Sequence, residues 1–190
     1  MAESHTRRTD AAIRACPPRG RVAVAAACSE HMRRLYRNDP EVGELDGFAD
    51  RTFAIAWRFV DGGRVDLAEV NRLRLETEAF ERRIDEDDAP GEFVYAAQTL
   101  AYTLRAILEP DVVKWASYAV TTADSAVYAA RGLDPKDSED EEIAWQCKAL
   151  DLVRAAGDQP VPRAQWQVLV AEKPRWLARL ETLRPWIAEP

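Results

Sequence analysis

The stretch of sequence that decides the fold runs from Gly91 to Leu108 and reads GEFVYAAQTLAYTLRAIL. Its apolar residues recur at helical spacing, and its only charged residues are Glu92 and Arg105. A helix that is apolar almost all round is buried on every side. The sequence therefore predicts a central helix over residues 91–108, with the other elements packed around it.

Prolines and glycines divide the rest of the chain into further helical windows. Because a proline inside a helix costs about 3 kcal/mol, the proline-free windows are the candidate helices. They predict helices over residues 21–37, 46–60, 67–84, 111–131 and 137–156. Small residues form a stripe on the 111–131 helix and let two helix axes approach closely, so we expect it to pack against the 91–108 helix.

The spacing of apolar residues and prolines also predicts the fold class and how the chain is divided into segments. Alternation of apolar and polar residues over the length of a strand is lacking, so we expect no sheet. We predict an all-α fold: a single-domain helical bundle of about six core helices plus one or two short C-terminal helices. Residues 1–20 are expected to form a basic, frayed N-terminal tail, residues 21–157 the bundle, and residues 158–190 a proline- and tryptophan-containing extension packed on it.

Composition limits the classes of partner. The 190 residues carry a formal net charge of −7, and an acidic protein repels phosphate, so we expect neither nucleic acid nor a membrane as partner. The three cysteines lack C-x-x-C spacing, which favours reduced thiols over a disulfide framework. No apolar stretch approaches the roughly 18 residues of a membrane span. These features predict a cytoplasmic protein.

The acidity is concentrated in two segments. Residues 76–92 hold eight carboxylates against two arginines, and residues 134–142 hold six against one lysine. Such segments are either solubilising or a docking surface that steers a basic protein partner. On the second interpretation the partner-binding residues are Asp85, Glu86, Asp87, Asp88, Asp137, Glu139, Asp140, Glu141 and Glu142.

Tryptophans are concentrated near the C-terminus, at positions 145, 166, 176 and 186. Aromatic burial anchors short helices, so we expect most of these side chains to pack the C-terminal helices onto the bundle. Trp186 is the exception that we assign to a partner interface, because tryptophan is enriched at binding hot spots.

The sequence offers few candidate catalytic residues. His5 lies in the expected tail, whereas Cys28 and His31 are three residues apart and share one helix face. A Cys–His nucleophile is one interpretation of that pair, but Cys28 continues an apolar run, which favours core packing. Zinc motifs and glycine-rich phosphate loops are lacking from the sequence. We therefore predict a non-enzymatic protein without catalytic residues, metal or cofactor.

One enzymatic alternative rests on paired carboxylates. Glu41 and Glu44, Glu78 and Glu81, and Asp85 and Asp88 are each separated by one helical turn. Such pairs resemble those of the all-α nucleotide pyrophosphatases, which hold Mg²⁺ between pairs on two adjacent helices. The alternative function is therefore a Mg²⁺-dependent nucleotide hydrolase, and it requires two of these pairs to converge.

The segment Ala27-Cys28-Ser29-Glu30-His31-Met32, followed by Phe53-Ala54-Ile55-Ala56-Trp57, resembles the YjaG-like family of bacterial proteins of unknown function. The resemblance covers residues 22–156 and implies an all-helical fold; it assigns no catalytic role to Cys28, Glu30 or His31. In size and charge the chain also looks like the small acidic immunity proteins of bacterial toxin systems. We therefore predict an immunity-type protein that neutralises a cognate, basic toxin domain, with a self-associating housekeeping protein as a further alternative.

Overall fold

The computed structural model describes residues 5–40, 42–86, 89–130, 132–157 and 159–184. Within these ranges it contains nine α-helices, one 3-10 helix and no strand, which confirms the all-α prediction. The helices are α1 (His5–Ala15), α2 (Pro18–Met32), η1 (Arg33–Leu35, the 3-10 helix), α3 (Gly43–Val60), α4 (Leu67–Glu86), α5 (Gly91–Leu108), α6 (Val113–Ala129), α7 (Pro135–Ala156), α8 (Arg163–Ala171) and α9 (Arg175–Leu183). None of the described helices is both long and apolar enough to cross a membrane.

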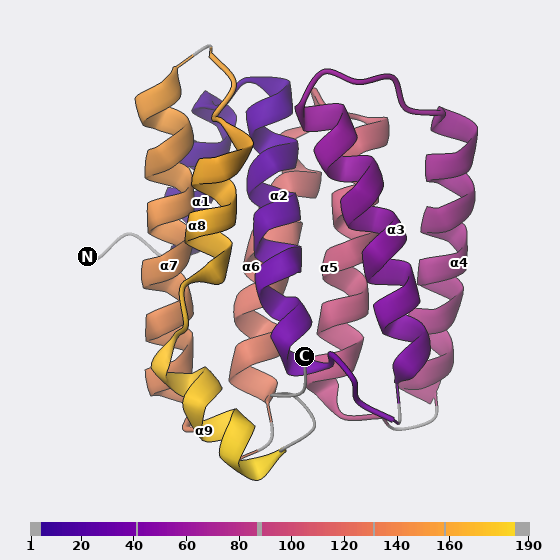
Figure 1. The fold of residues 1–190 in the computed structure, drawn as a ribbon, viewed down its shortest axis with the longest axis vertical. Coiled ribbons are helices and arrows are strands. Elements are labelled where there is room, and N and C mark those ends of the chain that lie inside the picture. The colour runs from indigo at the N-terminus through magenta and orange to yellow at the C-terminus, as the bar shows by residue number, and fades with distance from the viewer. Residues whose placement is uncertain (1–4, 41, 87–88, 131, 158, 185–190) are drawn as a thin grey trace.

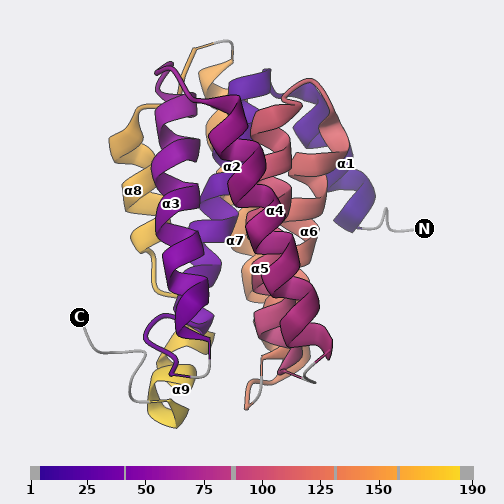
Figure 2. The same cartoon turned by 90° about the vertical axis from the view of Figure 1, so that its right-hand side faces the viewer.

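The long helices stand nearly parallel and form one bundle (Figure 1). Helices α4, α5, α6 and α7 follow one another in one layer, and α3, α2 and α8 cover it on one side. Figure 2 shows α1 on the other side, where it packs against α6 and α7. Helix α9 lies across the end of the bundle where α7 begins.

Helix α2 occupies the centre, in contact with α3, α5, α6, α7 and α8. Every residue from Val22 to Ser29 is buried, which is what an uninterrupted run of small apolar residues requires. The helix begins at Pro18, because proline at the first helical position has the right φ and lacks only an N–H that would be unpaired. The sequence assigned the centre to the 91–108 helix alone, whereas the structure shares it between α2 and α5.

The predicted pairing of α5 with α6 is confirmed, since these helices share the most extensive contact in the bundle. Alanines allow it: Ala97 on α5 and Ala119 and Ala123 on α6 are fully buried. Polar groups tie the pair to α2, where the Ser29 hydroxyl lies 2.7 Å from the Thr103 hydroxyl. Buried hydroxyls of this kind need a partner, so they also fix the register between the two helices.

The expectation of a frayed tail over residues 1–20 is wrong for residues 5–15, which form α1, and for residues 18–20, which begin α2. The buried residues Thr9, Ala12 and Ile13 of α1, and Cys16 directly after it, recur at helical spacing, and Ile13 is fully buried. The arginines around this narrow stripe made the segment look like a tail. Arg8 and Arg14 lie on the exposed face of a helix that packs on α6.

The C-terminal extension packs on the bundle as predicted. Trp166 on α8 is fully buried and lies 5.9 Å, between ring centroids, from Trp57 on α3. The Trp145 indole N–H donates to the Leu169 carbonyl at 3.0 Å, which ties α7 to α8. Trp176 on α9 is also buried, whereas Trp186 lies outside the described residues.

Candidate functional site

Both acidic segments lie at the same end of the bundle. The C-terminus of α4, the N-terminus of α5, the C-terminus of α6 and the N-terminus of α7 all lie at the lower end in Figure 1. Helices α5 and α6 separate α4 from α7, so with interaxial distances of about 8–10 Å the two segments are roughly 25–30 Å apart. They form two patches on one end, which we call the α4 patch and the α7 patch.

The α4 patch consists of Asp85 and Glu86 among the described residues. Both side chains are exposed at the end of α4, and neither forms an ion pair within the described part of the chain. Asp87 and Asp88, which the sequence placed in the same site, lie outside the described residues.

The α7 patch consists of Asp134, Asp137 and Asp140, which are all exposed, with Glu139 half-exposed beside them. The Asp134 carboxylate accepts a hydrogen bond from the Asp137 N–H at 3.2 Å and so caps α7. Acidic residues in the first turn also face the positive end of the helix dipole. Attraction to this dipole offsets part of the repulsion among the carboxylates at the N-terminus of α7.

Glu141, the next acidic residue of α7, is already bound by the chain itself. Its carboxylate accepts hydrogen bonds from the Arg175 N–H at 2.9 Å and the Trp176 N–H at 3.3 Å. It therefore caps the N-terminus of α9 and holds that helix against α7. Of the acidic residues predicted to bind a partner, Glu141 has the clearest role within the fold.

The prediction that Glu142 binds a partner is wrong, because its side chain is fully buried and faces the interior of the bundle. Its Oε2 atom lies 3.4 Å from Nε2 of His31, an ion-pair contact without hydrogen-bond geometry. The Gln146 amide donates to its Oε1 atom at 3.3 Å. A buried carboxylate is costly unless it is paired, so Glu142 has to face α2.

His31 is the centre of this buried cluster. Its ring stacks on Trp145 with 4.0 Å between centroids, and the edge of Trp176 lies against it at 6.0 Å. A guanidinium nitrogen of Arg34 lies 3.4 Å from Nδ1. The cluster joins α2, α7 and α9, and the sequence did not reveal it because its members are far apart in the chain.

The Cys28–His31 nucleophile is not supported by the surroundings of the thiol. Burial raises the pKa of Cys28 well above its usual range, and the nearby carboxylates of Glu142 and Asp124 raise it further. The thiolate is the nucleophilic form of cysteine, so a thiol held in its protonated form is a poor nucleophile. The prediction of core packing is confirmed for Cys28, which is fully buried, and the structure buries His31 fully as well.

Of the carboxylate pairs required by the nucleotide hydrolase alternative, Glu78 and Glu81 are both bound by other side chains of the chain. The other two pairs are incomplete, because Glu41 and Asp88 lie outside the described residues. Partial burial raises the pKa of Glu78, but hydrogen bonds from Arg74 and Arg105 outweigh it and lower the pKa overall. The Gln98 amide donates to Glu81 at 2.8 Å, and Glu44 pairs with an arginine. Within the described ranges, no three histidine, cysteine or acidic side chains are arranged to hold a metal ion.

A recess opens between the α7 patch and α9. It encloses about 430 Å³ and is lined by residues of opposite charge and one aromatic ring, namely Leu133, Asp134, Asp137, Ser138, Asp140, Glu141, Arg175, Trp176 and Arg179. The Trp176 indole N–H is buried and has no acceptor in the described part of the chain. Carboxylates beside an indole ring suit a cationic side chain, although Arg179 of the chain itself already lines the same recess.

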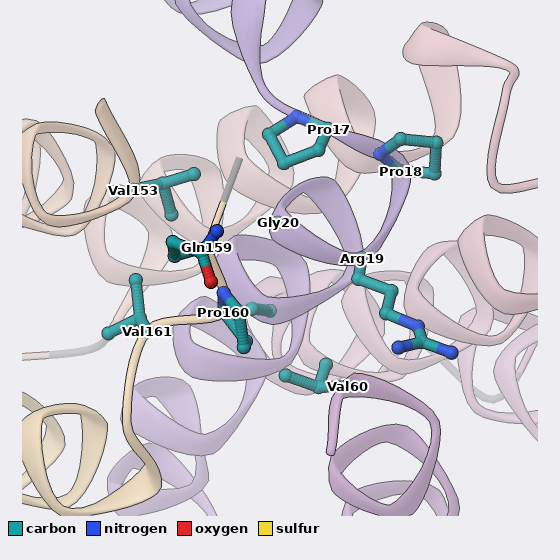
Figure 3. A pocket seen from close by; sticks show the side chains of 10 residues that line it. Pro17, Pro18, Arg19, Gly20, Val60, Val153, Gln159, Pro160 and Val161 are labelled. Carbon is teal, nitrogen blue, oxygen red and sulfur yellow. The ribbon is translucent and has the colours of Figure 1, made fainter. Parts of the chain in front are cut away.

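A second hollow of different character lies at the opposite end of the bundle (Figure 3). It encloses about 340 Å³, and its walls come from the start of α2, the end of α3, the last turns of α7 and the segment that leads to α8. Prolines and valines dominate the lining, with Arg19 at the rim. No local pattern in the sequence indicates this hollow, because its walls come from three parts of the chain that are far apart: the start of α2, the end of α3, and the end of α7 with the segment after it.

Comparisons with protein-family models, with curated proteins and with solved structures find no match to this chain. The resemblance of residues 22–156 to the YjaG-like family therefore stays a prediction. The function is therefore inferred from the geometry at the two ends of the bundle.

Proposed function

We propose that this protein is a non-enzymatic, protein-binding module that docks a basic partner at its acidic end, most concretely an immunity-type protein that neutralises a cognate toxin domain. The observation that carries the proposal is the contrast among the carboxylates of this end. Glu92, Glu141 and Glu142 are held by groups of the chain itself, whereas the α4 patch and the α7 patch remain exposed.

Exposed carboxylates that form no ion pair within the described part of the chain repel one another, so they lower the free energy of unfolding slightly or leave it unchanged. A basic partner relieves this repulsion and is attracted over a distance, which raises its association rate. Two patches roughly 25–30 Å apart suit a protein surface better than a small cation. The recess beside the α7 patch gives such a surface a place for one lysine or arginine side chain.

The experiment measures association with a candidate toxin domain encoded beside the gene for this chain, by stopped-flow mixing at low and physiological ionic strength. The test variants are Asp85→Asn with Glu86→Gln, and Asp137→Asn with Asp140→Asn. Each should slow association several-fold at about 0.01 M salt, where the Debye length is about 30 Å, and much less at about 0.15 M, where it is about 8 Å. Co-expression should protect cells from the toxin.

The matched control is Asp61→Asn with Glu69→Gln, which makes the same change in net charge on exposed residues at the opposite end. It should leave the association rate close to that of the unchanged protein. Equal effects of the control and test variants would show that only net charge matters and would overturn the docking site. A toxin domain that neither binds nor is neutralised would overturn the immunity-type function.

A further inference from the structure

The hollow at the end of the bundle opposite the acidic patches is a mainly apolar pocket. Ala23 of α2, Val60 of α3, Val153 of α7 and Val161 of the α7–α8 segment are all at least nine-tenths buried and line it. Figure 3 shows the three valines around one space, with Pro17 and Pro160 on its walls. An apolar lining from four separate segments excludes water more effectively than an open groove does.

Gly20 determines how closely the walls approach. A Cβ atom at this position would lie 2.8 Å from the Val153 side chain and 3.2 Å from Pro17. A side chain there would push α2 away from α7 and occupy part of the space. The absence of a side chain at Gly20 therefore lets α2 lie close to α7 and leaves this part of the hollow unfilled.

The charge at the rim is positive and not neutralised by the described part of the chain. Arg19 is exposed, lies on the Val60 side of the hollow and forms no ion pair with any described carboxylate. A Cβ atom on Gly62 would lie 3.0 Å from its guanidinium, so the arginine is positioned against the turn after α3. Pro17 and Pro18 have no N–H to donate, which leaves Arg19 as the charged group of this rim.

We propose that this hollow binds a small monocarboxylic acid, with its hydrocarbon body against the valines and prolines and its carboxylate at Arg19. The volume of about 340 Å³ lies at the lower end of the range for ligand pockets, which suits a short hydrocarbon chain and excludes a helix or a folded segment. Burial of the chain supplies the affinity, because each buried methylene contributes favourably. The guanidinium supplies the preference for an anion.

The test uses the full chain and a series of probes: butanoate, hexanoate and octanoate, with octan-1-ol and octylammonium as matched compounds without the negative charge. Binding is followed by amide chemical shifts and by calorimetry. Affinity should rise about fourfold for each added methylene that is buried. Octanoate should perturb the amides of Gly20, Val60 and Val161, and should bind more tightly than the alcohol, with octylammonium weakest.

The variant Arg19→Gln separates the charge from the pocket. It should weaken octanoate about 2–5-fold, since an exposed ion pair contributes modestly, and should leave octan-1-ol unchanged. Arg64→Gln is the matched control, because Arg64 is an exposed arginine at the same end that does not line the hollow. Both substitutions replace exposed side chains, so we expect the free energy of unfolding to change little.

Two results would overturn this proposal. Affinity that does not increase with chain length, or shifts at amides remote from the hollow, would show that the pocket does not hold the hydrocarbon. An unchanged preference for octanoate in Arg19→Gln would show that this arginine does not hold the carboxylate. Neither result bears on the acidic end, which lies at the other end of the bundle.

Discussion

The two ends of this bundle are built from the same helices but differ in what they expose. At the acidic end, helix termini carry carboxylates, some of which are buried in ion pairs with α2 and with the C-terminal extension. At the other end, prolines, valines and a glycine surround an apolar hollow with an arginine at its rim. The first end is stabilised by pairing of charges and the second by packing, so substitutions at the two ends should have different consequences.

The largest effect is expected at Arg184, whose guanidinium pairs with the fully buried Glu92 and lies 3.4 Å from the Leu35 carbonyl. Arg184→Leu leaves a buried carboxylate without its cation and should lower the free energy of unfolding by about 3–5 kcal/mol. Urea denaturation followed by circular dichroism measures this loss in the free energy of unfolding. The double variant Glu92→Leu with Arg184→Leu should recover most of the loss, and a single variant as stable as the unchanged protein would contradict the role given to this pair.

The next effect concerns packing at the hollow. Gly20→Ala places a Cβ atom 2.8 Å from Val153, so α2 has to move and the free energy of unfolding should fall by about 1–3 kcal/mol. Gly47→Ala is the matched control within a helix, because nothing lies within 4 Å of the new atom. That control should stabilise the protein by about 0.5–1 kcal/mol, since alanine is the better helix former. Equal stability of the two variants would show that α2 and α7 are not in close contact.

A third comparison sets paired carboxylates against unpaired ones as the pH falls. Hydrogen bonds from Arg74 and Arg105 lower the pKa of Glu78 despite its partial burial, so the folded state binds its proton less readily than the unfolded state does. The stabilisation is therefore complete above an unfolded pKa of about 4.3 and is lost as the pH falls through the lower folded value.

Glu78→Gln removes this dependence. Its difference from the unchanged protein in the free energy of unfolding should be greatest near neutral pH and should shrink below about pH 4. Asp137→Asn, at an exposed carboxylate without an ion pair, serves as the control and should show no such trend. A pH-independent difference for Glu78→Gln would mean that the two arginines do not lower the pKa of Glu78.

The smallest effect compares two helix caps, one at each end. Asp66 accepts a hydrogen bond from the Ala68 N–H at 2.9 Å at the start of α4, and Asp134 accepts one from Asp137 at the start of α7. Replacement by alanine should cost about 1 kcal/mol at either position. The loss at Asp134 should be smaller by a few tenths, because its removal also relieves repulsion within the α7 patch.

Thermal unfolding at low salt measures the two losses, and added salt should reduce the difference between them. A larger loss at Asp134 than at Asp66 would show that the carboxylates of the α7 patch do not repel one another appreciably.

The sequence by itself determined most of the helices and the pairing of α5 with α6. Prolines and glycines are local signals, so the boundaries of the 91–108 helix were predicted without error, and the small residues of α6 indicated its contact with α5. The start of α4 at residue 67 was predicted as well, and the Asp66 side chain caps it through the Ala68 N–H, a local interaction. The N-terminal helix was missed because its apolar stripe, Thr9 to Cys16, is narrow and lies among arginines.

Only the tertiary structure decided which of these residues face a partner. Glu141 and Glu142 are neighbours of Asp140 in an unbroken acidic run, yet one caps α9 and the other is buried beside His31. The hollow at Gly20 depends on four segments that meet only after folding. Exposure and the pairing of charges depend on contacts between residues far apart in the chain, and no local pattern in this sequence records those contacts.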